Sequence, residues 1–180
     1  MQHWADEGDT GRAAVGDALG VEGFALEHYR LPPGEGLPSG LHTHLDQAET
    51  FVVLAGELQF ETLDDSVTVE AGEAVRFAPG EYQTGDNGGE EEAVVVAVGA
   101  PRESNEVRVP LDCPDCHHRG LSPEWEGEVV LACPDCGADH RTCGCPDCDR
   151  EELEVTAGDD GGTLVVCPGC GAERTEPAWK

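Results

Sequence analysis

The sequence predicts a mainly β protein that consists of an antiparallel sandwich or barrel followed by a small Cys-rich region. Three observations support this. Short runs of alternating apolar residues, punctuated by Gly and Pro, extend from about residue 23 to residue 98. All nine cysteines lie after residue 112. Only residues 8–20 have a composition that suits a short helix, with disorder as the alternative.

Strand-sized apolar runs at close spacing, separated by turn residues, are typical of antiparallel sandwiches and barrels. Gly56 separates two of these runs, and the pair Asp64-Asp65 marks a turn before another. The last run is continuously apolar. The predicted strands are 24–31, 51–55, 58–63, 67–69, 74–77 and 93–98.

Composition divides the chain further. The segment Pro-Arg-Glu-Ser-Asn-Glu, which begins at Pro101, is polar and follows closely on Gly99, which suits a linker. We therefore expect an N-terminal extension, a barrel, a linker and two metal-binding modules. Their predicted ranges are 1–22, 23–100, 101–110, 111–140 and 141–176.

The chain is strongly acidic, with a formal net charge of -28 from 38 acidic and 10 basic residues. Such a surface disfavours binding to a phosphate backbone. Because the acids are spread along the chain, a single disordered acidic tail is a poor explanation. Lys180 is the only lysine. This composition resembles that of proteins from salt-accumulating halophilic archaea. In molar salt, the range of charge repulsion falls to about 3 Å.

Three side chains suited to a divalent metal ion lie close together in the first part. Residues two apart in a strand point the same way, so His42 and His44 present two imidazoles on one face. Glu49 opens the next predicted strand and can return to that face. With open positions, two imidazoles and one carboxylate match the facial triad of non-haem iron sites. The alternative is a polar histidine pair on a solvent face.

The spacing of these residues adds to this interpretation. Gly-x5-His-x-His-x4-Glu-x6-Gly, formed by Gly36, His42, His44, Glu49 and Gly56, resembles the first motif of the cupin superfamily. The resemblance implies a jelly-roll barrel with a divalent metal inside one mouth, as Mn, Fe, Ni or Zn. It also implies a small-molecule ligand and a homodimer that pairs through strands.

A second stretch, residues 72–87, resembles the second cupin motif. Gly72, Gly80 and Asn87 match it, while Pro79 lies one position later than the usual proline. The family usually supplies a fourth ligand, a histidine, where this chain has Gln83. A Gln carbonyl oxygen is a weak, neutral ligand. Gln83 is therefore expected to ligate weakly, to hydrogen-bond a metal-bound water, or to lie in a site without metal.

The C-terminal half contains four Cys-x2-Cys pairs, each of which can direct two thiolates at one metal. Sixteen residues separate the first pair from the second, and eighteen separate the third from the fourth, which fits the zinc pattern. Consecutive pairing predicts two zinc ribbons, with an interleaved arrangement as the alternative. The predicted ligands are Cys113, Cys116, Cys133 and Cys136 for one zinc ion, and Cys145, Cys148, Cys167 and Cys170 for the other.

Other uses of these cysteines are less consistent with the sequence. Disulfides need an oxidising compartment, and residues 1–9 carry no apolar signal pattern. A redox dithiol normally accompanies a βαβ pattern. Four-thiolate iron remains an alternative. Cys143 is left over and could substitute as a ligand, while His117, His118 and His140 are expected at the surface.

These observations support three hypotheses for the function. The chain is a metal-dependent enzyme, such as a dioxygenase, an isomerase or an enzyme that modifies sugars or small acids. Alternatively, it senses a ligand without catalysis and uses its zinc ribbons to dock a protein or nucleic acid. In the third, the histidine pair is vestigial.

No run approaches the roughly 18 apolar residues of a membrane span, and residues 1–9 carry no signal pattern. We therefore expect a cytoplasmic protein.

Overall fold

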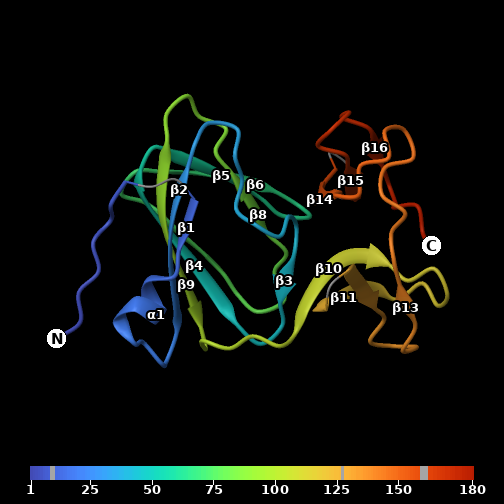
Figure 1. Cartoon of the computed structure of the whole chain (residues 1–180), viewed down its shortest axis with the longest axis horizontal. Helices are drawn as coiled ribbons and strands as arrows, with labels where there is room; N and C mark the ends of the chain where they lie inside the picture. The colour runs from blue at the N-terminus through green and yellow to red at the C-terminus, as the bar shows by residue number, and fades with distance from the viewer. Residues whose placement is uncertain (9–10, 127, 159–161) are drawn as a thin grey trace.

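The structure, a computed structural model, describes residues 1–8, 11–126, 128–158 and 162–180. A barrel forms one side of the molecule and the Cys-rich half forms the other (Figure 1). The two are joined where the short strand β3 (Thr43–His44) pairs with β10 (Val107–Asp112). The predicted ligand His44 therefore lies at the junction, and His42 lies just before it.

Two antiparallel sheets make up the barrel. The strand order is β1-β2-β9-β4-β7 in the larger sheet and β6-β5-β8 in the smaller one. The strands of the larger sheet are β1 (Gly11–Ala13), β2 (Ala25–Leu31), β9 (Ala93–Ala100), β4 (Ala48–Ala55) and β7 (Ala74–Phe77). Those of the smaller sheet are β6 (Ser66–Glu70), β5 (Glu57–Glu61) and β8 (Thr84–Asp86). This mainly β fold confirms the predicted class.

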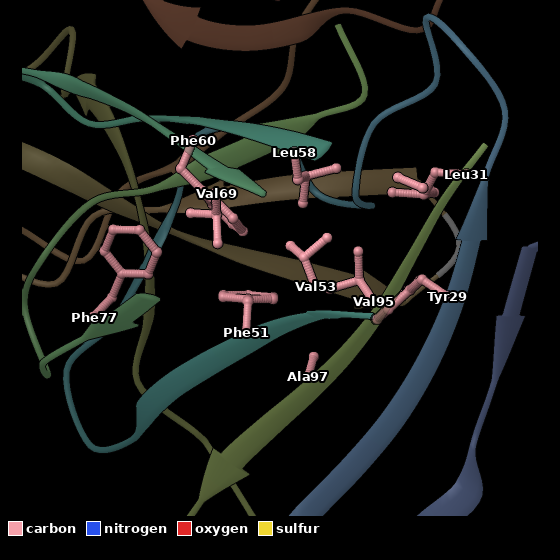
Figure 2. Close-up of a cluster of buried hydrophobic side chains, with 11 residues drawn as sticks. Tyr29, Leu31, Phe51, Val53, Leu58, Phe60, Val69, Phe77, Val95 and Ala97 are labelled. Carbon is pink, nitrogen blue, oxygen red and sulfur yellow. The ribbon is translucent and has the colours of Figure 1, made fainter. Parts of the chain in front are cut away.

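Alternation along the strands produces the barrel core. In β9, Ala93, Val95 and Ala97 are buried, while the residues between them are partly exposed. Three phenylalanines, Phe51, Phe60 and Phe77, gather inside with ring centroids 4.9, 5.4 and 6.2 Å apart. Figure 2 shows that side chains from both sheets converge on this cluster. The barrel therefore has a continuous apolar core of its own.

The N-terminal extension contributes to the barrel. Strand β1 adds to the edge of the larger sheet by pairing with β2. Helix α1 (Val15–Leu19) follows and ends at Gly20, whose φ of 65° is left-handed and lets the chain reverse. Its Val15 is buried. The helix lies within the 8–20 range that the composition favoured.

The Cys-rich half contains two modules, each built around its own sheet. The first is built on β10, β11 (Arg119–Glu126), β12 (Glu128–Ala132) and β13 (Asp139–His140). The second has β14 (Glu154–Ala157), β15 (Thr163–Val166) and β16 (Glu173–Arg174). Val165 of the second module packs in one buried cluster with Leu111 and Leu131 of the first. The two modules therefore share a core.

The predicted linker, residues 101–110, is irregular only in its first part, residues 101–106. Residues 107–110 belong to β10, because Val107 and Arg108 pair with His44 and Thr43 of the barrel. The apolar Val109 and Pro110 are buried there. Within the described residues, no helix is long and apolar enough to cross a membrane.

Candidate metal centres

The three predicted ligands of the barrel come from two strands and a bridge between them. His42 forms an isolated β-bridge with Gln83, with N to O distances of 3.1 and 2.9 Å. His44 lies in β3, which pairs with β10, and Glu49 lies in β4. One ligand atom from each of His42, His44 and Glu49 lies within 4.8 Å of the others. The sequence spacing therefore predicted a true spatial cluster.

Hydrogen bonds fix the tautomers of both imidazoles. Nδ1 of His42 lies 2.8 Å from the carbonyl oxygen of Gly40, which can only accept a hydrogen bond. Nδ1 of His44 lies 2.7 Å from Oγ of Ser104, whose single proton is donated to Asp46 Oδ1 at 2.6 Å. Both Nδ1 atoms must therefore carry the proton, so both Nε2 atoms keep a lone pair.

These lone pairs face the Glu49 carboxylate. Nε2 of His42 is 4.0 Å from Glu49 Oε2, and Nε2 of His44 is 3.7 Å from the same atom. Two ligands bonded to one ion at about 2.0–2.2 Å each lie about 3–4 Å apart. Three lone-pair donors at this separation repel one another unless a cation lies between them. The spacing suits one divalent ion.

Gln83 is the fourth residue of this group. Its Nε2 donates a hydrogen bond to Glu49 Oε2 at 2.8 Å, so its Oε1 is the remaining acceptor. The side chain is buried, and Oε1 has no hydrogen-bond partner in the part of the chain that the structure describes. A buried unpaired acceptor costs free energy, which a cation or a bound water would recover. The residues present therefore fit a metal ion.

The electrostatics of the barrel site favour neutral imidazole. Burial lowers the pKa of His44, and the facing His42 lowers it further against the opposing effects of Glu49 and Asp46. A neutral imidazole is the form that binds a metal. The side chains of His42, His44 and Glu49 are 12%, 16% and 20% exposed, so the cluster is reachable from solvent.

The first Cys cluster brings together Cys113, Cys116, Cys133 and Cys136. Sγ of Cys113 lies 3.8 Å from Sγ of Cys136, and Sγ of Cys116 lies 3.6 Å from Sγ of Cys133. Sulfurs around a tetrahedral zinc, bonded at about 2.3 Å, are separated by about 3.8 Å. Consecutive pairing of the Cys-x2-Cys motifs is the arrangement that the structure adopts.

The second cluster repeats this geometry with Cys145, Cys148, Cys167 and Cys170. Sγ to Sγ distances are 3.6 Å from Cys145 to Cys170 and 3.5 Å from Cys148 to Cys167. All nine cysteines are free thiols. Two four-sulfur groups of tetrahedral dimensions therefore lie in the Cys-rich half.

Each of the four knuckles has the same backbone turn. The N–H of the residue after each Cys-x2-Cys pair donates to the carbonyl oxygen of the first cysteine, at 2.8 or 2.9 Å. This residue always has a positive φ, which explains the glycines Gly137 and Gly171. The other two knuckles use His117 and Asp149 at φ values of 61° and 59°. The turn aims both thiols of a pair to one side.

Crowding gives the thiols of each cluster different acidities. The backbone N–H of Cys136 lowers the pKa of Cys133 to about 6. The backbone N–H of His118 favours the thiolate of Cys116, but burial and the other thiols outweigh it and raise that pKa to about 12. A second thiolate beside the first is therefore unfavourable unless a cation offsets its charge. A divalent cation bound to the sulfurs removes this repulsion between thiolates.

Two further side chains, those of His140 and Cys143, lie near the knuckles. His140 was expected at the surface, but it is 8% exposed, because it packs against Trp179 with ring centroids 5.6 Å apart. Its Nε2 lies 3.3 Å from Sγ of Cys113, within hydrogen-bond distance. Cys143 stands outside both clusters, and its thiol donates to the carbonyl oxygen of Trp179 at 3.3 Å. His117 is exposed and His118 partly so.

Sequence reasoning missed the residues that hold the histidines. Ser104 and Asp46 orient His44, and the backbone of Gly40 orients His42. Ser104 lies in a polar segment about 60 residues from His44, so no local pattern marks it. Such partners decide which nitrogen of an imidazole is free for a metal.

Comparison with known proteins finds a family match within the barrel. Residues 27–99 match the cupin domain. The chain is similar to a cupin protein from Bacteroides fragilis, with 21% identity and a TM-score of 0.48. The match covers 58% of this chain and 88% of that chain. It is also similar to a protein with a double-stranded β-helix domain from Klebsiella pneumoniae subsp. pneumoniae, with 22% identity and a TM-score of 0.47. This match covers 57% of this chain and 85% of that chain.

A third similar structure is an oxalate oxidase in complex with the substrate analogue glycolate. Here the identity is 23%, 56% of each chain is covered, and the TM-score is 0.44. This chain thus spans a little over half the length of that enzyme. No curated protein matches this chain significantly.

Proposed function

We propose that residues 27–99, which match the cupin domain, form a metal-dependent enzyme for a small molecule that binds through oxygen atoms. His42, His44 and Glu49 hold the ion, and Gln83 Oε1 either completes the set or accepts a hydrogen bond from a bound water. The observation that carries the proposal is the pair of Nε2 lone pairs aimed at one carboxylate.

The residues assign separate tasks within the site. Gly40 and Ser104 hold the two imidazoles, while Gln83 Nε2 holds the carboxylate of Glu49. A divalent ion bound here supplies a Lewis acid that polarises a ligand oxygen. Phe77 is paired opposite Glu49, so its side chain lies on the same face of the sheet. Partial exposure of the histidines leaves one side open to a ligand.

Dioxygenase and isomerase chemistry are the two classes that this donor set serves most readily. Two histidines and one carboxylate with open positions suit iron and molecular oxygen. Mn, Ni and Zn suit non-redox reactions of the same site. The alternative function is ligand sensing without catalysis, in which the same donors bind an ion and a small molecule but turn nothing over.

We further propose that each Cys cluster holds a structural zinc ion. Four thiolates leave no open position, so these sites stabilise the fold and take no part in catalysis. Metal binding worth about 10–16 kcal/mol per site can fold a segment that lacks a large apolar core. Zinc-bound thiolates suit a reducing compartment, and a cytoplasmic location is part of this proposal. A docking role for these modules and a homodimer through the barrel strands remain proposals.

Metal analysis of the purified chain tests the barrel site. We expect wild type to carry about two zinc ions plus one further divalent ion. The variant His42→Ala/His44→Ala should lose only that further ion, because the Cys clusters are untouched. The control is His3→Ala, which removes an exposed imidazole outside both Cys clusters and should lose nothing. Equal metal contents in the double variant and this control would rule out the barrel site.

Oxygen uptake tests the catalytic assignment. The Fe²⁺-loaded chain is supplied with a set of small hydroxy and keto acids in an oxygen electrode. Uptake that exceeds that of His42→Ala/His44→Ala with at least one acid supports a dioxygenase. Equal rates with every acid would contradict this class and leave the non-redox assignments.

A further inference from the structure

The second Cys-rich module touches the barrel at the loop that precedes His42. The N–H of Leu41 donates to the carbonyl oxygen of Val155 in β14 at 2.7 Å. The approach is close, because a Cβ at Gly40 would lie 2.9 Å from that same oxygen. Beside it, Oγ1 of Thr156 donates to Glu61 Oε2 at 3.0 Å. Strand β14 is therefore fastened to the barrel.

This contact acts on the backbone that orients a proposed metal ligand. The carbonyl oxygen of Gly40 accepts the Nδ1–H of His42, so the position of residue 40 sets the direction of the imidazole. Leu41, between them, is fully buried. Gly40 has a φ of 60°, which only a few residue types adopt readily. The loop is therefore held from both sides, by the barrel and by β14.

The position of Val155 depends in turn on the second Cys cluster. Strand β14 pairs with β15, Val155 opposite Val165, and Cys167 follows β15 directly. Cys148 lies a few residues before β14. Among the described residues of the second module, the buried apolar groups include Val165 and the side chains of Cys145 and Cys167. Pairing with β15 holds β14 in its hairpin, and a metal ion that joined the four sulfurs would fix the two ends of that hairpin relative to each other.

From this chain of contacts we infer that metal at the second Cys cluster raises the affinity of the barrel site for its own ion. The contact of Val155 with Gly40 and Leu41 transmits the effect to His42. The inference rests on the proposed barrel site. Linkage makes the effect reciprocal, so an ion in the barrel tightens zinc binding by the same factor. The second module is a positioning element for His42.

Binding of Mn²⁺ to the full chain, followed by the electron paramagnetic resonance signal of free Mn²⁺, tests the inference. Thiolates bind Mn²⁺ poorly, so this probe reports the barrel and leaves the zinc sites loaded. In Cys167→Ser/Cys170→Ser, we expect the Mn²⁺ dissociation constant to rise about tenfold. The matched control is Cys143→Ser, which removes a thiol outside both clusters. Equal dissociation constants in these two variants would overturn the inference.

A second pair of variants tests the contact without touching a cysteine. Gly40→Ala places a methyl group against the carbonyl oxygen of Val155, whereas Gly34→Ala has a similar positive φ and nothing within 4 Å. Zinc content should stay at two ions in both. We expect Gly40→Ala to weaken Mn²⁺ binding and Gly34→Ala to leave it unchanged. Equal effects would mean that backbone strain alone acts on His42, against the inference.

Failure of the barrel site and failure of its coupling to the second Cys cluster give different results. If wild type binds no Mn²⁺ beyond that bound by His42→Ala/His44→Ala, the barrel site itself is wrong. If wild type binds this ion, and both test variants match their controls, the barrel site stands and only the coupling fails. A weaker zinc site in Mn²⁺-free protein than in Mn²⁺-loaded protein would support the coupling from the opposite direction.

Discussion

At the residue scale, the barrel site depends on where two protons lie. Ser104 has one hydroxyl proton and gives it to Asp46, so it must accept the Nδ1–H of His44. The carbonyl oxygen of Gly40 imposes the same tautomer on His42. Both imidazoles thus turn Nε2 toward Glu49. The predicted ligands are chemically competent because of neighbours that the motif does not include.

Ser104→Ala removes the acceptor for His44 and tests this role. Outer-shell partners of metal ligands are worth about 10–100-fold in affinity. We expect the Mn²⁺ dissociation constant to rise about tenfold, measured by the same resonance signal. Ser66→Ala, at an exposed position in β6, is the matched control and should change nothing. An unchanged dissociation constant in Ser104→Ala would show that His44 needs no orienting partner.

At the element scale, the positions of the strands followed from local patterns, but their partners did not. Alternation predicted β2, β4, β5, β6, β7 and β9 to within a few residues. The pairing of β3 with β10 joins segments more than 60 residues apart, and no local signal predicts it. Burial of His140 was missed for the same reason, because Trp179 covers it from the far end of the chain.

The turn between β4 and β5 shows how a motif glycine serves an element. Gly56 has a φ of 69°, and a Cβ there would lie 2.7 Å from the carbonyl oxygen of Glu92. Gly72 has a φ of 91° and nothing within 4 Å of a Cβ. Positive φ is a requirement shared by both turns. Close approach to β9 is particular to Gly56.

Substitution by alanine separates these two requirements. Gly72→Ala should lower the free energy of unfolding by about 1 kcal/mol, the cost of a left-handed Cβ. Gly56→Ala should cost about 3 kcal/mol, because strand β9 must also move. Denaturant unfolding measures both. Equal losses would contradict the close approach and leave φ as the only constraint.

At the scale of the whole molecule, the two halves are stabilised differently. The barrel has an apolar core that includes three phenylalanines, whereas the buried cluster of the Cys-rich half includes the proposed ligands Cys113 and Cys133. The ligand pairs and the ribbon-like repeats were predictable from spacing. How the modules pack on the barrel loop was not, because the contact of Val155 with Leu41 is a backbone hydrogen bond.

Net charge also acts at this scale. With a formal charge of -28 on 180 residues, self-repulsion opposes the compact state in dilute buffer. In molar salt, screening shortens the range of this repulsion to about 3 Å. We expect the β circular dichroism of the chain to weaken on dialysis from molar KCl into dilute buffer. Sucrose at equal osmolality, which does not screen charge, should fail to restore it. An unchanged spectrum would show that the fold needs no salt.

The most direct test of the central claim is anomalous scattering from crystals of the Mn²⁺-loaded chain, recorded at the manganese edge. We predict one strong peak at about 2.0–2.3 Å from Nε2 of His42, Nε2 of His44 and a carboxylate oxygen of Glu49. The orphaned oxygen of Gln83 should face the same peak. If manganese peaks appear elsewhere and none lies among these residues, the proposed barrel metal site is wrong.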